Sequence, residues 1–65
     1  MITYEVHYQW KTKTTRKWHS STNSYESILR AREDFENFSN HGGDAFDEDG
    51  YTYGNVQLFK VEELS

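Results

Sequence analysis

Apolar and polar side chains alternate strictly at the start of the chain. The apolar positions are Ile2, Tyr4, Val6, Tyr8 and Trp10, and the residues between them are polar. Because successive side chains of a β-strand point to opposite faces of the sheet, this period of two predicts a half-buried strand over residues 2–11. This strand carries the longest apolar face in the chain, so we expect it at the centre of a sheet whose apolar face is covered by a second layer.

The segment 16–22 predicts a second strand that returns antiparallel to the first. It is rich in residues that strands tolerate, and only a short connection separates it from residue 11. Placing Trp10 opposite Trp18 leaves a three-residue tip, 13–15. No Asn-Gly pair or single glycine marks a tight turn there, so this register depends on pairing the two tryptophans.

A helix is predicted over residues 24–39. Asn23 followed by Glu26 resembles a capping box, and Ser24 is the competing N-cap. Apolar residues then recur at spacings of three and four, which is typical of a helix with one apolar stripe. The stripe contains Tyr25, Ile28, Leu29, Ala31, Phe35 and Phe38. We expect this stripe to lie on the sheet.

The segment 51–61 predicts the third strand. Its alternation breaks between Leu58 and Phe59, and Gly54 lies just upstream, so we expect a β-bulge or an irregular first half. The element order is therefore ββαβ. These elements predict one α+β domain over residues 1–65, with a three-stranded antiparallel sheet of order 2-1-3 and one helix on one face.

Length and composition exclude several classes of function. A chain of 65 residues buries only about 60% of its unfolded surface, which disfavours an enclosed catalytic site. It contains no cysteine, so disulfides and thiolate metal sites are excluded. No apolar run exceeds two residues, which argues against a membrane span or a signal peptide. We expect a cytoplasmic, soluble protein that is not an enzyme and needs neither a cofactor nor a metal.

Basic residues gather around the predicted hairpin. The four cations there are Lys11, Lys13, Arg16 and Lys17, out of seven in the chain. Cations neutralise phosphates, and an exposed tryptophan such as Trp18 can stack on an unpaired base. The net charge of −4 argues the other way, since nucleic-acid-binding domains are usually basic. Nucleic-acid binding through this hairpin is therefore the alternative hypothesis.

Carboxylates gather in the loop before the third strand. They are Asp44, Asp47, Glu48 and Asp49. A calcium-loop alignment fails, because it puts Ala45 at the first position and Val56 where the bidentate glutamate belongs. An acidic patch that docks on a basic protein surface fits this loop better, and it would steer association.

Hydrophobic residues make up 34% of the chain and aromatic residues 17%, so half of the hydrophobic residues are aromatic. One helix cannot cover that many rings, and aromatic residues left outside are typical of interface hot spots. We therefore expect a protein-binding module whose partner is another protein or a nucleoprotein complex, with pairing of its own copies as a further possibility. The expected contact residues are Trp10, Arg16, Lys17, Trp18, Asp44, Asp47, Glu48, Asp49, Tyr51 and Tyr53.

In size, acidity and lack of cysteine, the chain resembles the short accessory proteins with which bacteriophages bind and block host enzymes or defence complexes. The resemblance lies in these bulk properties and in no motif. It implies inhibition of a protein or nucleoprotein target by steric or charge-based occlusion, without chemistry of the chain's own.

Overall fold

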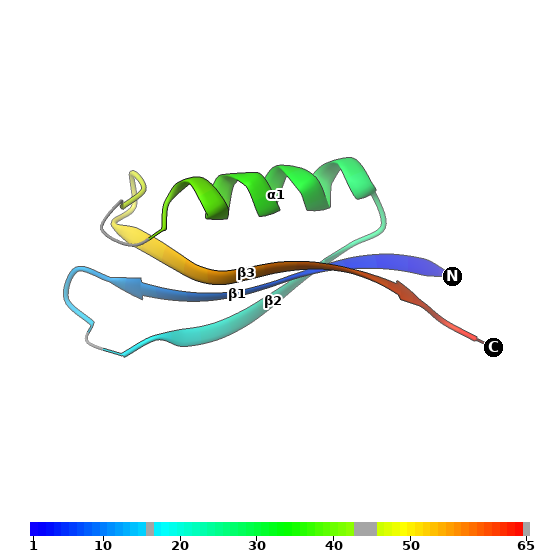
Figure 1. Ribbon diagram of the computed structural model, residues 1–65, viewed down its shortest axis with the longest axis horizontal. Helices are drawn as coiled ribbons and strands as arrows, with labels where there is room; N and C mark the ends of the chain where they lie inside the picture. Colours follow the sequence, from blue (N-terminus) through cyan, green and yellow to red (C-terminus); the bar gives the residue numbers. More distant parts are fainter. Residues whose placement is uncertain (16, 43–45, 65) are drawn as a thin grey trace.

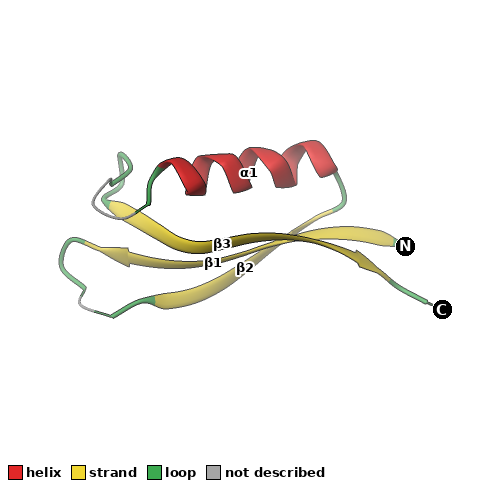
Figure 2. Ribbon diagram, in the orientation of Figure 1, coloured by secondary structure: helices red, strands yellow, loops and turns green. Residues whose placement is uncertain are grey.

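A three-stranded antiparallel sheet with one helix packed against it makes up the computed structural model, which describes residues 1–15, 17–42 and 46–64. The elements are β1 (Ile2–Thr12), β2 (His19–Tyr25), α1 (Ile28–Asn40) and β3 (Tyr51–Glu62). The strand order is β2-β1-β3, so the predicted fold class and the central place of the first strand are confirmed. The helix lies along one face of the sheet and leaves the other face open (Figures 1 and 2).

The two ends of the molecule differ. Both chain termini lie at one end, whereas the β1–β2 hairpin and the loop before β3 lie together at the other (Figure 1). The 13 residues of α1 make a helix of about 20 Å, while the long axis of the molecule measures 43 Å. The sheet therefore extends beyond the helix at both ends.

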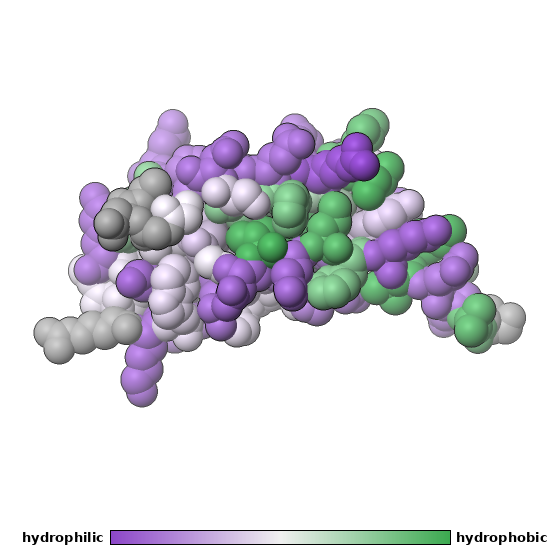
Figure 3. All heavy atoms as spheres, in the orientation of Figure 1, coloured by the Kyte–Doolittle hydropathy of each residue, from purple (hydrophilic) through white to green (hydrophobic). Residues whose placement is uncertain are grey.

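The hydrophobic core is small. Val6 and Ala31 are fully buried, and Phe38 is 9% exposed. Six half-buried side chains pack around them, namely Tyr4, Tyr8, Tyr25, Tyr53, Val56 and Leu58. Figure 3 shows hydrophobic side chains filling the space between helix and strands under a hydrophilic outer helix surface. Of the eleven aromatic residues, Phe38 alone is buried, Trp18 and Phe59 are exposed, and the other eight are half-buried.

The predicted apolar stripe is wrong at Leu29. This side chain is 74% exposed, and Ile28 beside it is 36% exposed. Successive helical residues are rotated by about 100°, so Leu29 lies about 200° from Ala31, which faces the sheet. The face that packs on the sheet is marked by Ala31 and Phe38.

The second strand begins three residues later than predicted and also ends later, at Tyr25. Its register pairs Trp10 with His19, where we expected Trp18. The connection is longer because Thr12 and Thr15 bond to each other: Thr12 N–H donates to Thr15 Oγ1 (2.7 Å), and Thr15 N–H donates to Thr12 Oγ1 (3.2 Å). Such side-chain-to-backbone bonds form a turn that competes with strand pairing.

This difference of one residue in register has a large consequence. A slip of one residue moves every side chain of a strand to the other face of the sheet. In the observed register, His19 lies on the helix side with Trp10. Trp18 instead packs on Gly54, whose cross-strand partner is Gln9, so its ring lies on the open face. The two tryptophans are therefore on opposite faces of the sheet.

The helix begins at Ile28, four residues later than predicted. Neither Asn23 nor Ser24 caps it, because both belong to β2 and pair with β1. The N-cap is Ser27, whose hydroxyl accepts a hydrogen bond from Arg30 N–H at 3.5 Å. Tyr25 also belongs to β2 and donates its hydroxyl proton to Asp34 on the helix. Long-range strand pairing has therefore overridden the local capping signal.

The predicted irregularity in the third strand is confirmed. The β1–β3 register shifts between His7, which pairs with Gln57, and Gln9, which pairs with Gly54. One extra residue of β3 is therefore accommodated, as in a β-bulge. Asn55 within this segment has a φ of +48°, and its side-chain amide donates to Gln9 Oε1 at 3.0 Å.

The bulge makes a test possible on β3. We expect Asn55→Val to lower the free energy of unfolding by about 1–2 kcal/mol, since a β-branched residue is strained at positive φ. Gln57→Val is the matched control, because Gln57 is exposed on the same strand in regular backbone, and we expect a change within about 0.5 kcal/mol. Urea unfolding of both variants measures the difference, and equal effects would contradict this view of the bulge.

Candidate functional site

Four aromatic side chains form a continuous surface on the helix side of the sheet, at its hairpin end. We name this surface, made of Tyr8, Trp10, Tyr51 and Tyr53, the aromatic floor; it lines a hollow of about 260 Å³. Tyr8 and Trp10 share one face of β1 because they are two residues apart, and Trp10 pairs with Tyr53 across the strands. The ring centroids of Trp10 and Tyr51 are 5.4 Å apart, and those of Tyr8 and Tyr53 are 5.8 Å apart.

The helix covers the aromatic floor only in part. Phe38, in the last turns of α1, contacts both Tyr8 and Tyr53, with a distance of 4.4 Å between ring centroids in each case. On the side of β2, His19 stacks on Trp10 at 4.6 Å, and Trp10 Nε1 donates to Ser21 Oγ at 3.1 Å. The rings are thus held in place by packing and hydrogen bonds while remaining only half-buried.

Asp47 anchors the loop before β3 to the floor. Its Oδ1 accepts from the backbone N–H of Tyr51 (2.8 Å) and of Asp49 (3.0 Å), and its Oδ2 accepts from the Tyr53 hydroxyl (2.8 Å). Gly50 closes the turn: its N–H donates to the Asp47 carbonyl oxygen, and its φ of +83° is a conformation that glycine adopts without strain. Asp47 was predicted as a contact residue, but its carboxylate accepts three hydrogen bonds from within the chain.

The two groups of this contact have shifted pKa values. Partial burial alone would raise the pKa of Asp47, but the hydrogen bonds from Tyr51, Tyr53 and Asp49 outweigh it and hold the pKa below the usual 3.8. Burial, together with the bond to Asp47, raises the pKa of Tyr53. The pair therefore stays a carboxylate and a neutral phenol at neutral pH.

The lowered pKa of Asp47 predicts a pH effect on stability. Its contribution is complete above the unfolded pKa near 3.8 and is lost as the pH falls through the lower folded value. We expect Asp47→Asn to cost about 1–2 kcal/mol of unfolding free energy at pH 6, and less at pH 3. Urea unfolding at both values measures this. Glu48→Gln is the control, with an expected change within about 0.5 kcal/mol at pH 6; a pH-independent loss in Asp47→Asn would contradict the assignment.

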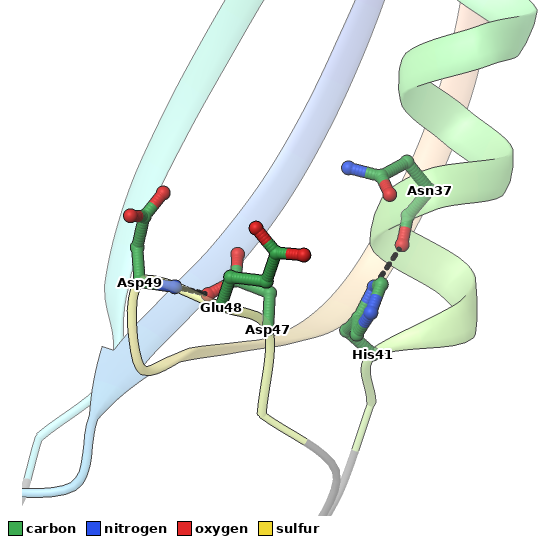
Figure 4. A pocket seen from close by; sticks show the side chains of 5 residues that line it. All are labelled: Asn37, His41, Asp47, Glu48 and Asp49. Atoms are coloured by element: carbon green, nitrogen blue, oxygen red, sulfur yellow. Dashed lines mark hydrogen bonds between the residues drawn. The ribbon is translucent and has the colours of Figure 1, made fainter.

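A second, polar hollow of about 260 Å³ lies beside Asp47. It is lined by Asn37, His41, Asp47, Glu48 and Asp49 (Figure 4). His41 ends the helix: its N–H donates to the Phe38 carbonyl oxygen, and its Nδ1 donates to that of Asn37 at 2.8 Å. Glu48 and Asp49 are exposed. We name Glu48 and Asp49 the acidic rim, since both are exposed beside this hollow.

The basic hairpin lies at the same end as the acidic loop. Lys13 Nζ is 5.3 Å from the ring centroid of Phe46, which precedes Asp47, so basic and acidic segments adjoin. On the open face, Lys11 Nζ lies 4.8 Å over the ring of Trp18, which is 41% exposed. Among the described cations of the hairpin, Lys13 therefore adjoins the acidic loop, whereas Lys11 lies on the open face.

The residues predicted for one contact surface are thus divided. Trp10, Tyr51 and Tyr53 meet on the helix side beside Asp47, Glu48 and Asp49. Trp18 lies on the opposite face, and Lys17 is exposed in the hairpin next to it. Arg16 and Asp44 lie outside the described residues. A flat partner can contact only one of the two faces at a time.

Sequence reasoning missed a group of exposed apolar side chains. They are Met1, Ile2, Ile28, Leu29, Phe59, Val61 and Leu64, each at least 36% exposed. The break in alternation at Phe59 was a usable signal for two of them, because it moves Phe59 and Val61 to the open face with His7. Leu29 is exposed because it lies about 200° around the helix axis from Ala31, which faces the sheet.

In the described parts of the chain, no three histidine or acidic side chains are placed to hold a metal ion. The helix that is described is too short and too polar to cross a membrane. In comparisons with known proteins, no family model matches the chain, and neither does any curated protein or any solved structure.

Proposed function

We propose that this chain is a small non-enzymatic protein-binding module that occludes its target through the aromatic floor. The observation that supports this most is that four half-buried aromatic rings form one surface that the helix covers only in part. Aromatic side chains are enriched at protein interfaces and dominate the binding energy there. Rings that are already fixed by Phe38, His19 and Asp47 lose little conformational entropy when a partner binds.

The charges around the floor favour a protein partner with exposed cations. Glu48 and Asp49 present exposed carboxylates beside it, and the chain carries a net charge of −4. Arginine suits such a place, because its planar guanidinium stacks on aromatic rings and pairs with carboxylates. The electrostatic field of these carboxylates would speed association and orient the partner, while the aromatic rings would provide most of the affinity.

The mechanism we infer is occlusion, with no reaction catalysed. A target whose basic surface is covered cannot use that surface for its own substrate or subunit. Blocking of a host enzyme or defence complex, as by the phage accessory proteins that the chain resembles in bulk properties, is the form of this function that we would test first.

Affinity capture tests the proposal. The tagged chain should retrieve a stoichiometric protein from a lysate, and the double variant Glu48→Lys, Asp49→Lys should retrieve it at least about tenfold less well, since it sets like charges against a basic partner. Glu33→Lys on the exposed helix surface is the matched control and should retain the partner. Equal capture by all three chains, or no stoichiometric partner, would contradict the proposal.

A nucleic-acid-binding regulator is the second candidate. It is favoured by Trp18, whose ring is 41% exposed with Lys11 over it. Four phosphate contacts, through Lys11, Lys13, Arg16 and Lys17, predict a log–log salt slope of about −3 to −4 for binding to DNA or RNA. The acidic loop beside the hairpin works against such contacts. Absence of binding at low salt would eliminate this candidate.

A further inference from the structure

The two edges of the sheet are not equivalent. At the hairpin end of β3, the segment 41–42 pairs with the edge: Tyr53 N–H donates to the His41 carbonyl oxygen at 2.9 Å, and Gly42 bridges to Tyr53. Gly42 lies so close that a Cβ atom there would come within 3.3 Å of the Tyr53 carbonyl oxygen. Farther along, β3 carries the bulge at Asn55 and the charged residues Lys60 and Glu62. Bulges, charges and covering segments are the usual protections of an edge strand.

The edge formed by β2 has none of these protections. Its sequence, His-Ser-Ser-Thr-Asn-Ser-Tyr, contains no Lys, Arg, Asp, Glu or Pro, and its register with β1 is regular over all seven residues. Among the described residues, β2 pairs with β1 and with no other strand. Its outer side therefore presents backbone N–H and C=O groups that another strand can use.

We propose that this edge pairs with the β2 edge of a second copy of the chain, antiparallel and centred on Thr22. Centring on the middle residue brings all seven residues of both strands into register. Thr22 then faces Thr22 of the second copy, and Ser20 faces Ser24, with hydroxyls on both sides. Ser21 faces Asn23, and His19 faces Tyr25. Such hydroxyl and aromatic cross-strand pairs are favourable.

Charge makes the second copy a suitable occupant of this edge. Each copy carries a net charge of −4, so two copies repel each other overall, and an uncharged contact strand avoids adding to this repulsion. The strand β2 itself contains no acidic or basic residue that would oppose its counterpart, and the Asp34 carboxylate near it accepts hydrogen bonds from Asn23 and Tyr25. The contact is self-complementary, as a two-fold interface requires.

The helices leave room for this pairing. A two-fold axis perpendicular to the sheet places both helices on one face of a six-stranded sheet. The two β1 strands would be three strand spacings apart, roughly 14 Å. Because α1 packs mainly on β3 and β1, its axis would lie at least about that far from its counterpart, beyond the 8–10 Å of packed helices. The aromatic floors would lie on the same face at opposite ends, so the dimer would present two.

Charged substitutions at the centre of this interface give a specific test. Thr22 and Gln57 are both exposed and flank His7 in one cross-strand row, so Gln57 is the matched control on the other edge. We expect the native chain to dimerise in a concentration series up to about 1 mM, the range in which a small interface assembles. Thr22→Lys and Thr22→Glu should each raise the dimer dissociation constant at least about fivefold, because like charges face each other.

Mixing the two variants should restore the dimer, since Lys then faces Glu. Gln57→Lys should dimerise like the native chain, and added salt should leave the native dimer intact. Sedimentation equilibrium measures the masses, and circular dichroism confirms that each variant is folded. A native chain that stays monomeric overturns the proposal, even if the edge accepts a strand of another protein. A dimer that Gln57→Lys disrupts and Thr22→Lys leaves intact also overturns it. The same holds if the mixture of Thr22→Lys and Thr22→Glu fails to associate.

Discussion

Replacing Phe38 with alanine is expected to lower the free energy of unfolding by about 3–5 kcal/mol. Phe38 is 9% exposed, and its ring contacts both Tyr8 and Tyr53, so truncation leaves a void between helix and sheet. A domain of this size has about 3–10 kcal/mol of stability in total. The variant should therefore be largely unfolded at 37 °C or melt at least about 12 °C lower than the native chain.

Leu29→Ala is the matched control on the same helix. The sequence pattern placed both residues in the apolar stripe, but Leu29 is 74% exposed, so we expect a change within about 0.5 kcal/mol. Thermal and urea unfolding followed by circular dichroism compare the two variants. A cost at Leu29 equal to that at Phe38 would mean that the helix packs through a different face from the one described.

Replacing Trp10 with alanine is expected to weaken binding of the captured protein partner by about 2 kcal/mol or more, roughly 30-fold. Trp10 lies in the aromatic floor, where its ring contacts Tyr51 and His19. Truncation at a central aromatic anchor removes contact area and opens the interface to water.

Trp18→Ala provides the same chemical change on the opposite face. It should alter partner affinity by less than about threefold, as expected for a residue outside the contact. Titration calorimetry with the purified partner measures both affinities, and circular dichroism checks that each variant remains folded. If Trp18→Ala weakens binding and Trp10→Ala does not, the open face is the binding surface and the aromatic floor is structural.

Much of the fold could be predicted from patterns along the chain. The alternation from Ile2 to Trp10 identified the central strand. The break in alternation after Leu58, with Gly54 upstream, predicted the irregularity that lies between Gly54 and Gln57. Both are local signals of side-chain period, which the backbone of a strand imposes directly. The candidate site was predictable only as a list of residues, because nothing in the sequence stated which of them share a face.

The errors concern residues whose hydrogen-bonding partners the sequence pattern does not identify. Asn23 and Glu26 have the spacing of a helix cap, yet β1 takes Asn23 into the sheet and leaves Ser27 to cap the helix. Asp47 looked like a free charge, yet three donors from its own loop and strand surround its carboxylate. Long-range strand pairing therefore explains the error at Asn23, whereas Asp47 is held by donors only two to six residues farther along the chain.

The amino-acid sequence alone determined the number, kind and order of the elements, because apolar periodicity dictates which segments are strands and which is the helix. The tertiary structure decided the register of β2, and with it the separation of Trp10 from Trp18. The reason is geometric. Side chains alternate between faces at every residue, so the Thr12–Thr15 turn, by shifting the pairing one position, assigned the two tryptophans to opposite sides of the sheet.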